Sequence, residues 1–265
     1  MNMKTKIIFG VVTGALFFGE IATAQSVPTA QEIIARSDEV RNPKEPFQVT
    51  IQLTEYIAGT ERNETALTVY SKLAATSEKF RNLVRYAEPP RDRGKSVLMD
   101  GTMMWFYDPA SKTSVRISPE QRLVGQASQG DVVTVNLARD YTARLVGSPD
   151  GETIQDADKV ARRCWHLELA PKSNEAVYAK AEYWVERDSF HPIKGKFYSD
   201  SGRVLKIAYY HRYEKQLGAE RPSETIIIDA VNAKLVTTMN FHGYRGLDIP
   251  DSWYQREYLP RLKID

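Results

Sequence analysis

The sequence predicts an α+β, mainly β fold: a strongly curved antiparallel sheet that forms an incomplete barrel, with helices covering its concave face. Apolar and polar residues alternate with a period of two along most of the chain, which is typical of strands with one buried face. Short turn signals join these segments, and this favours antiparallel pairing. An amphipathic helix near the N-terminus needs a sheet face to pack against, which a helix-free sandwich does not offer.

The composition is that of an ordinary globular chain. Of its 265 residues, 42% are hydrophobic and 26% are charged, which excludes a disordered chain, a collagen-like fibre and a polytopic membrane protein. A net charge of +2 gives no broad field that would attract nucleic acid, so we expect no nucleic-acid partner. Cys164, the sole cysteine, cannot form an internal disulfide and is expected to be a small buried strand residue.

Residues 1–24 have the three parts of a secretory signal peptide. Two lysines precede a mostly apolar run from Ile7 to Phe18, and a stretch of small residues ends at Ala24. The apolar run is shorter than the about 20 residues that cross a bilayer, so a retained membrane anchor is only the alternative. We expect cleavage after Ala24, export, and a single domain over residues 25–265.

The first expected helix begins at Thr29. Thr29-Ala-Gln-Glu32 is a capping box, and Pro43 ends the helical pattern. A helix of this length is marginal alone, so its apolar stripe must pack against the rest of the protein. The stripe comprises Ala30, Ile33, Ile34, Ser37 and Val40. We expect this helix to be a lid whose residues Ile33, Ile34 and Val40 face the sheet.

About ten strands are expected after this helix. The clearest local signal is Asp100-Gly101, a dipeptide that tolerates the positive φ of a type I′ turn and joins Val97–Met99 to Thr102–Tyr107 in a hairpin. Ser199–Gly202 marks a second hairpin. The other expected strands cover residues 47–53, 67–73, 79–86, 115–117, 167–169, 177–185, 193–198, 204–213, 225–228 and 234–241.

Two stretches give other signals. Residues 119–141 combine a loop-like Gln126–Gly130 with Asp131–Asp140, which fits either a capped helix or a strand, and the sequence leaves this open. Near the C-terminus, Ser252 can cap a short helix that ends before Pro260.

Sequence motifs for catalysis and for metal binding are missing. The four histidines lie on separate segments without metal-ligand spacing, and the sequence has no P-loop, Gly-x-Ser-x-Gly elbow or Gly-x-Gly-x-x-Gly run. We therefore expect no catalytic residue, no metal and no cofactor. A hydrolase built on two distant carboxylates stays open as an alternative, because such a pair leaves no mark in one sequence.

The apolar faces of the first hairpins predict a binding surface. If the hairpins pair in order, one concave surface is lined by Phe47, Val49, Ile51, Leu53, Leu67, Val69, Phe80, Val84, Met99, Trp105 and Tyr107. The simpler interpretation is that this surface is only core beneath the helix. One short helix covers little of so wide a sheet, however, and the uncovered area favours an apolar ligand.

The stretch Val97–Pro109 resembles the LolA-like family of outer-membrane lipoprotein-sorting proteins. In that family an aspartate-glycine turn is followed by a Trp-Phe-Tyr segment and an Asn/Asp-Pro turn, as in Asp100-Gly101, Trp105–Tyr107 and Asp108-Pro109 here. Residues 29–118 carry most of the likeness. The later half, with Tyr183-Trp184-Val185 and Ile249-Pro-Asp-Ser-Trp253, is more similar to a longer branch of the superfamily, which as a whole comprises LolA-, LolB- and RseB-type proteins.

The resemblance implies a periplasmic, non-enzymatic carrier whose incomplete barrel shields the acyl chains of lipoproteins or other lipids during outer-membrane sorting. It places ligand contacts on Phe80, Trp105 and Tyr107. Members of the longer branch are often encoded beside RND-type exporters, so an inner-membrane exporter or an outer-membrane acceptor is an implied partner. A regulatory or sensory lipid-binding domain, as in RseB-like proteins, is the alternative function.

One departure from the family pattern concerns the lid. LolA carriers latch their lid with an arginine, and the corresponding position here holds Thr76 or Ser77. The same latch is therefore not carried over to this chain.

Overall fold

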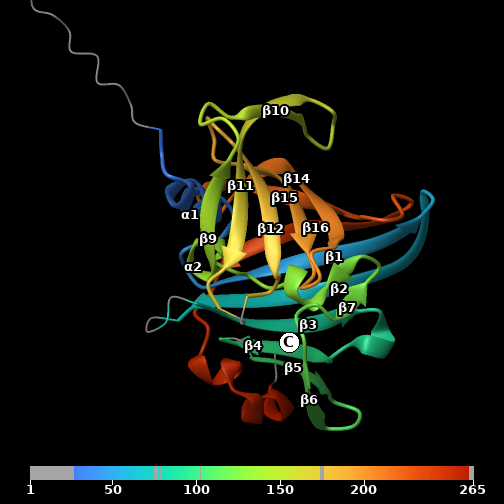
Figure 1. Cartoon of the computed structure of the whole chain (residues 1–265). Coiled ribbons are helices and arrows are strands. Elements are labelled where there is room, and N and C mark those ends of the chain that lie inside the picture. Colours follow the sequence, from blue (N-terminus) through green and yellow to red (C-terminus); the bar gives the residue numbers. More distant parts are fainter. Residues whose placement is uncertain (1–26, 75–76, 78, 102, 174–175, 263–265) are drawn as a thin grey trace, which may run out of the picture.

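The computed structural model describes residues 27–262 except 75–76, 78, 102 and 174–175. The expected signal peptide, residues 1–24, lies outside this part, so its cleavage stays a prediction. The described residues form one 14-stranded sheet, in which all pairings are antiparallel, and a small ribbon of two strands. The sheet curves without closing into a barrel (Figure 1), which confirms the predicted fold class.

The sheet has two halves: β1–β6 form the first, and β9–β16 form the second. The first half contains β1 (Phe47–Ile57), β2 (Thr60–Leu73), β3 (Phe80–Glu88), β4 (Ser96–Asp100), β5 (Met103–Asp108) and β6 (Thr113–Ile117). The second half contains β9 (Tyr141–Val146), β10 (Glu152–Gln155), β11 (Ala161–Pro171), β12 (Lys180–Glu186), β13 (Pro192–Tyr198), β14 (Val204–Gln216), β15 (Ala219–Asp229) and β16 (Leu235–Gly246).

Pairing between β1 and β16 joins these halves. From β1 the chain runs outward through hairpins to β6, crosses the concave face, and returns from β10 through to β16, while β9 pairs with β11. Ile51 lies opposite Phe241, and Leu53 lies opposite Met239. Both halves therefore contribute side chains to one continuous concave face.

The helix α1 (Ala30–Arg41) begins where the capping box predicts. The Thr29 backbone N–H donates to the Glu32 carboxylate at 2.7 Å, and the Glu32 backbone N–H donates to the Thr29 hydroxyl at 3.2 Å. Ile33 and Ile34 are fully buried in the main core, and the helix packs against β9, β12 and β15. Among the described residues, no helix combines the length and the hydropathy that crossing a membrane requires.

Residues 118–140, here called the crossing segment, run over the concave face from β6 to β9. Their elements are β7 (Arg122–Val124), β8 (Ala127–Ser128), the 3-10 helix η2 (Gln129–Asp131) and α2 (Leu137–Asp140). These pieces are too short for a periodic pattern, which is why the sequence left the stretch open. The segment's side chains buried in the main core are Ala127, Val132, Val133 and Leu137. The crossing segment therefore covers the part of the concave face that α1 does not reach.

The outer face of β2–β5 carries a second buried cluster. Residues 247–262, the C-terminal segment, cover it with two 3-10 helices, η3 (Asp251–Tyr254) and η4 (Arg256–Arg261). A third 3-10 helix, η1 (Pro90–Asp92), follows β3. The prediction of one C-terminal helix capped by Ser252 is wrong, because η3 already begins after Pro250 and has no side-chain cap. The buried members of the cluster are Tyr70, Leu83, Leu98, Tyr107, Ile249, Tyr254 and Leu259.

The outer face of β9, β11 and β12 carries polar side chains and a small buried cluster of Cys164, Trp184 and Ile193. The Glu168 carboxylate accepts hydrogen bonds from Lys180 at 2.5 Å and from Arg144 at 2.8 Å. Both bonds lower the pKa of Glu168, which falls to about 2, and the bond from Lys180 has the largest effect. Cys164 on β11 is fully buried, as predicted, and burial raises the pKa of its thiol to about 12.

Candidate functional site: a cavity under the crossing segment

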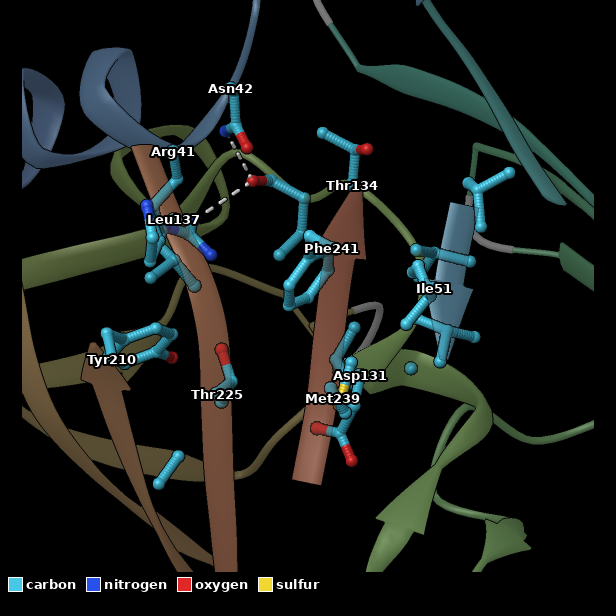
Figure 2. A pocket seen from close by; sticks show the side chains of 18 of the residues that line it. Arg41, Asn42, Ile51, Asp131, Thr134, Leu137, Tyr210, Thr225, Met239 and Phe241 are labelled. Atoms are coloured by element: carbon cyan, nitrogen blue, oxygen red, sulfur yellow. Dashed lines mark hydrogen bonds between the residues drawn. The ribbon is translucent and has the colours of Figure 1, made fainter. Parts of the chain in front are cut away.

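An internal cavity of about 130 Å³ lies between the concave face of the sheet and the crossing segment. One wall comes from β1, β2 and β13–β16, and the other comes from residues 130–137 and the C-terminal end of α1. Figure 2 shows Ile51, Met239, Phe241 and Leu137 around this space. The apolar lining residues are Phe47, Val49, Ile51, Val69, Val132, Val133, Val135, Leu137, Val177, Phe197, Ala208, Ile227, Met239 and Phe241.

The structure brings most of the sequence-predicted surface together on the concave face. Val49, Ile51 and Val69 line the cavity, and so does Phe47. Five further predicted residues belong to the same buried core but lie outside the cavity lining: Leu53, Leu67, Phe80, Val84 and Met99. Phe80 and Met99 line a smaller space under residues 134–140.

The placement of Trp105 and Tyr107 on this surface was wrong. Asp100 pairs with Met103 across a two-residue turn, so Leu98 lies opposite Trp105 and Met99 lies opposite Met104. A two-residue loop pairs odd with even positions, and Met104 and Phe106 therefore occupy the concave face instead. Tyr107 is buried in the outer cluster, and Trp105 packs against that cluster beneath the guanidinium of Arg256, 4.0 Å from the ring centre.

The predicted lid helix reaches the cavity through its C-terminal end. Ile33, Ile34 and Val40 pack against the main core but are not part of the cavity lining. Arg41 and the following Asn42 do line the cavity. Neither residue was predicted to line a site, because neither belongs to the apolar stripe of the helix.

A buried ion pair fastens the crossing segment to β14. The Lys206 ammonium contacts the Asp131 carboxylate and donates to the Ser128 hydroxyl at 3.0 Å, and the Lys206 and Asp131 side chains are only 7% and 11% exposed. Asp131 also accepts from the Tyr178 hydroxyl at 2.5 Å and from the Ser128 backbone N–H at 2.7 Å. Burial raises the pKa of Tyr178 well above its ordinary value, so its phenol remains a donor.

Further polar contacts hold the segment along its length. Thr134 donates its backbone N–H to the Asn82 side chain at 2.9 Å, accepts from the Asn82 amide at 3.0 Å, and shares a 2.7 Å hydroxyl contact with Ser71. The Val135 carbonyl accepts from the Asn42 side chain at 2.9 Å. Because one such bond contributes about 1 kcal/mol net, the segment is held by several modest contacts in addition to its buried apolar residues.

A surface groove of about 760 Å³ meets the cavity at Val177 and Tyr178, which line both spaces. The groove lies between the end of β6 and the residues that precede β12. Gly130 of the crossing segment packs so closely here that an added Cβ would lie 2.5 Å from Val177. Val177, Tyr178 and the crossing segment therefore separate the groove from the cavity.

Comparison with known proteins identifies the family. A LolA superfamily protein from Nitrosomonas europaea is 30% identical over 87% of this chain and 99% of its own, with a TM-score of 0.75. The chain belongs to the LolA superfamily. A protein-family model described as "Uncharacterized protein" matches residues 78–261. No curated protein sequence matches the chain.

Two other solved structures share the LolA-superfamily fold at lower identity. A domain from Vibrio parahaemolyticus described as an outer-membrane lipoprotein-sorting protein is 17% identical over 88% of this chain and 98% of its own, with a TM-score of 0.72. A DUF1329 family protein from Desulfovibrio piger is 19% identical over 87% of this chain and 97% of its own, with a TM-score of 0.71. At these identities the likeness concerns the fold alone.

The LolA-type latch position falls on Ser77 or on Thr76, which lies outside the described residues. The contacts described above, from β2, β3, β14 and the end of α1, hold the crossing segment. The lining residues on the second half of the sheet were not predicted either. A period-two pattern was available at Ala208, Ile227, Met239 and Phe241, but the β1–β16 pairing that brings them beside Ile51 could not be inferred from it.

Proposed function

We propose that the protein is a non-enzymatic carrier that binds the acyl chain of a lipoprotein or another lipid in the cavity between the sheet and the crossing segment. The observation that carries this proposal is a mostly apolar internal cavity, walled on one side by a short segment that is fastened by polar contacts. Apolar cavities with a few polar groups are the usual binding sites for small apolar ligands.

The size of the cavity requires the crossing segment to move. A cavity of about 150 Å³ in another protein holds benzene, so 130 Å³ accommodates only part of an acyl chain. Displacing Val132, Val133 and Leu137 from the concave face would leave a trough along β1, β2 and β14–β16. The groove that meets the cavity at Val177 and Tyr178 is the nearest opening through which a chain could enter.

The energetics also favour a movable wall. Burying one methylene contributes about 0.8 kcal/mol, so an acyl chain of about fifteen carbons would gain roughly 12 kcal/mol if it were fully buried. A rigid site of that affinity would not release its ligand. Reinsertion of the apolar residues of the crossing segment into the trough offsets part of this gain and allows transfer to an acceptor.

The proposed setting is the periplasm. The expected signal peptide at residues 1–24 would export the chain, and membership of the LolA superfamily supports a role in outer-membrane lipoprotein sorting or in support of an RND-type exporter. The partner that delivers the lipid would be an inner-membrane protein, and the acceptor would lie at the outer membrane.

A binding experiment with two matched variants tests the proposal. Ala208 is buried and lines the cavity, whereas Ala170 on β11 is exposed. Ala208→Leu should fill the cavity and reduce binding of a fluorescent fatty acid at least tenfold, while Ala170→Leu should bind like the wild type. Circular dichroism checks that both variants are folded. A folded Ala208→Leu variant with unchanged binding, or a wild type that binds no acyl probe, contradicts the proposal.

A further inference from the structure

One end of the cavity is polar. Arg41 and Asn42 at the end of α1 line it together with Tyr210 on β14, Thr225 on β15 and Tyr244 on β16. In Figure 2, Arg41, Tyr210 and Thr225 lie on one side of the cavity, while Ile51 lies on the far side beyond Phe241. The cavity therefore has an apolar end and an end where Arg41, which is paired with Asp38, lies near several hydroxyl groups. Asp131, Asp140 and Lys206 are also among the lining residues.

The guanidinium of Arg41 is only partly used by the protein. Its Nη2 donates to Asp38 at 2.5 Å and to the Val135 carbonyl at 3.3 Å. Its Nε is buried and has no hydrogen-bond partner among the described residues. The side chain is 16% exposed and lines the cavity. A guanidinium carries five N–H donors, so donors remain for a ligand.

Arg221, a neighbouring arginine, is bonded to backbone carbonyls of the protein and serves as a comparison for Arg41. Arg221 on β15 donates to the backbone carbonyls of Gln216 at 3.1 Å, Glu39 at 3.2 Å and Val40 at 2.7 Å, and it is 4% exposed. Its Nη1 satisfies two carbonyls at the end of α1, and its Nε satisfies the Gln216 carbonyl. Arg41, the residue that follows Val40, has the Asp38 carboxylate on one side and the cavity on the other.

The hydroxyl groups near Arg41 add to the polar end. Tyr210 lies near Arg41, and its ring meets that of Tyr183 edge to face at 5.6 Å. Buried polar groups without partners are costly and uncommon in folded proteins, so the unpartnered Nε of Arg41 beside the cavity points to a ligand group.

We propose that Arg41, assisted by Asn42 and Tyr210, binds the anionic head group of a single-chain amphiphile whose hydrocarbon tail lies along the apolar wall toward Ile51. The head group is a carboxylate or a phosphate monoester, since both accept charge-assisted hydrogen bonds from a guanidinium. This inference rests on the proposed function, because it needs the same cavity to hold an alkyl chain. It adds a chemical class of ligand that an apolar trough alone would not select.

The Asp38 carboxyl beside Arg41 has a raised pKa. Burial raises the pKa of Asp38 above its ordinary value, while Arg41 and the backbone N–H of Ala138 act against this and Asp140 adds to it. A ligand anion beside Arg41 would favour the neutral form of Asp38 further.

The test compares three ligands with one tail: laurate, dodecyl phosphate and the neutral dodecanol. The wild type should bind at least one of the two anions tenfold or more tightly than dodecanol in a calorimetric or probe-displacement titration. The stronger of the two anions identifies the head group. Asp38→Asn with Arg41→Gln removes both charges of the buried pair together, so that no unpaired charge is left to unfold the chain. In that double variant the preference over dodecanol should disappear while dodecanol binding stays unchanged.

Two outcomes would overturn the head-group site, and a third would contradict the proposed carrier function. Arg36→Gln is the matched control, because it removes the same charge from an exposed position of the same helix, and it should keep the preference. Equal affinity of the wild type for dodecanol and both anions would overturn the head-group site and leave the acyl carrier standing. A preference that survives in the folded double variant would also overturn it. Failure of the wild type to bind any of the three ligands would contradict the carrier itself.

Discussion

Lys206→Met should destabilise the protein by about 3 kcal/mol, because it leaves Asp131 charged and buried. Removing one partner of a buried ion pair typically costs about 3–5 kcal/mol. The lower end applies here, since Asp131 keeps hydrogen bonds from Tyr178 and from the hydroxyl and backbone N–H of Ser128. Urea unfolding at neutral pH measures the change, and Lys44→Met, at a position whose side chain is 82% exposed, is the control that should change little.

A second variant separates the charge from the packing. Lys206→Met combined with Asp131→Asn removes the unpaired charge and should recover most of the lost stability, to within about 1 kcal/mol of the wild type. Amide hydrogen exchange should become faster in residues 127–140 of the single variant, because the ion pair fastens that stretch to β14. A single variant within 0.5 kcal/mol of the wild type, or a double variant no more stable than the single, would refute this reasoning.

Three further predictions concern other parts of the molecule. Glu168→Gln should lower stability above about pH 5, and the difference from the wild type should vanish as the pH falls from 4.5 toward 2, because the folded pKa of about 2 lies below the unfolded value; urea titrations across this range measure it. Gly125→Ala should cost at least about 1–2 kcal/mol in the same assay, since Gly125 has φ +53° and an added Cβ would collide with Thr237. Trp105→Ala should expose the C-terminal segment around Arg256 to limited proteolysis while leaving fatty-acid binding unchanged; weakened binding would contradict its outer placement.

Local signals in the sequence predicted local structure correctly. The capping box fixed the start of α1, and Asp100-Gly101 fixed a hairpin, because both act through contacts between residues close in the chain. The same hairpin also shows how a face can be misassigned. The turn was predicted correctly, but a two-residue turn pairs even-numbered with odd-numbered positions. Trp105 therefore shares a face with Leu98 rather than with Met99, and both Trp105 and Tyr107 were placed on the wrong side of the sheet.

The cavity depended on contacts that the sequence does not display. Residues Val49, Ile51 and Val69 were found from their alternation, whereas Lys206 and Arg41 are charged and were passed over in a search for apolar faces. Register between β1 and β16 links residues nearly 200 positions apart, and no local pattern specifies such a pairing. The crossing segment is irregular and is held by side-chain contacts to several strands, which also leave no periodic signal.

The central claim is that acyl chains bind beneath a crossing segment that must move, and locking that segment tests it most directly. The Ser71 and Thr134 hydroxyl oxygens are 2.7 Å apart, so Ser71→Cys with Thr134→Cys should form a disulfide between β2 and the crossing segment. Cys164 is buried and does not compete. The reduced double variant should take up a fluorescent fatty acid like the wild type, and the oxidised variant should not. Equal uptake by the oxidised and reduced forms would contradict the account.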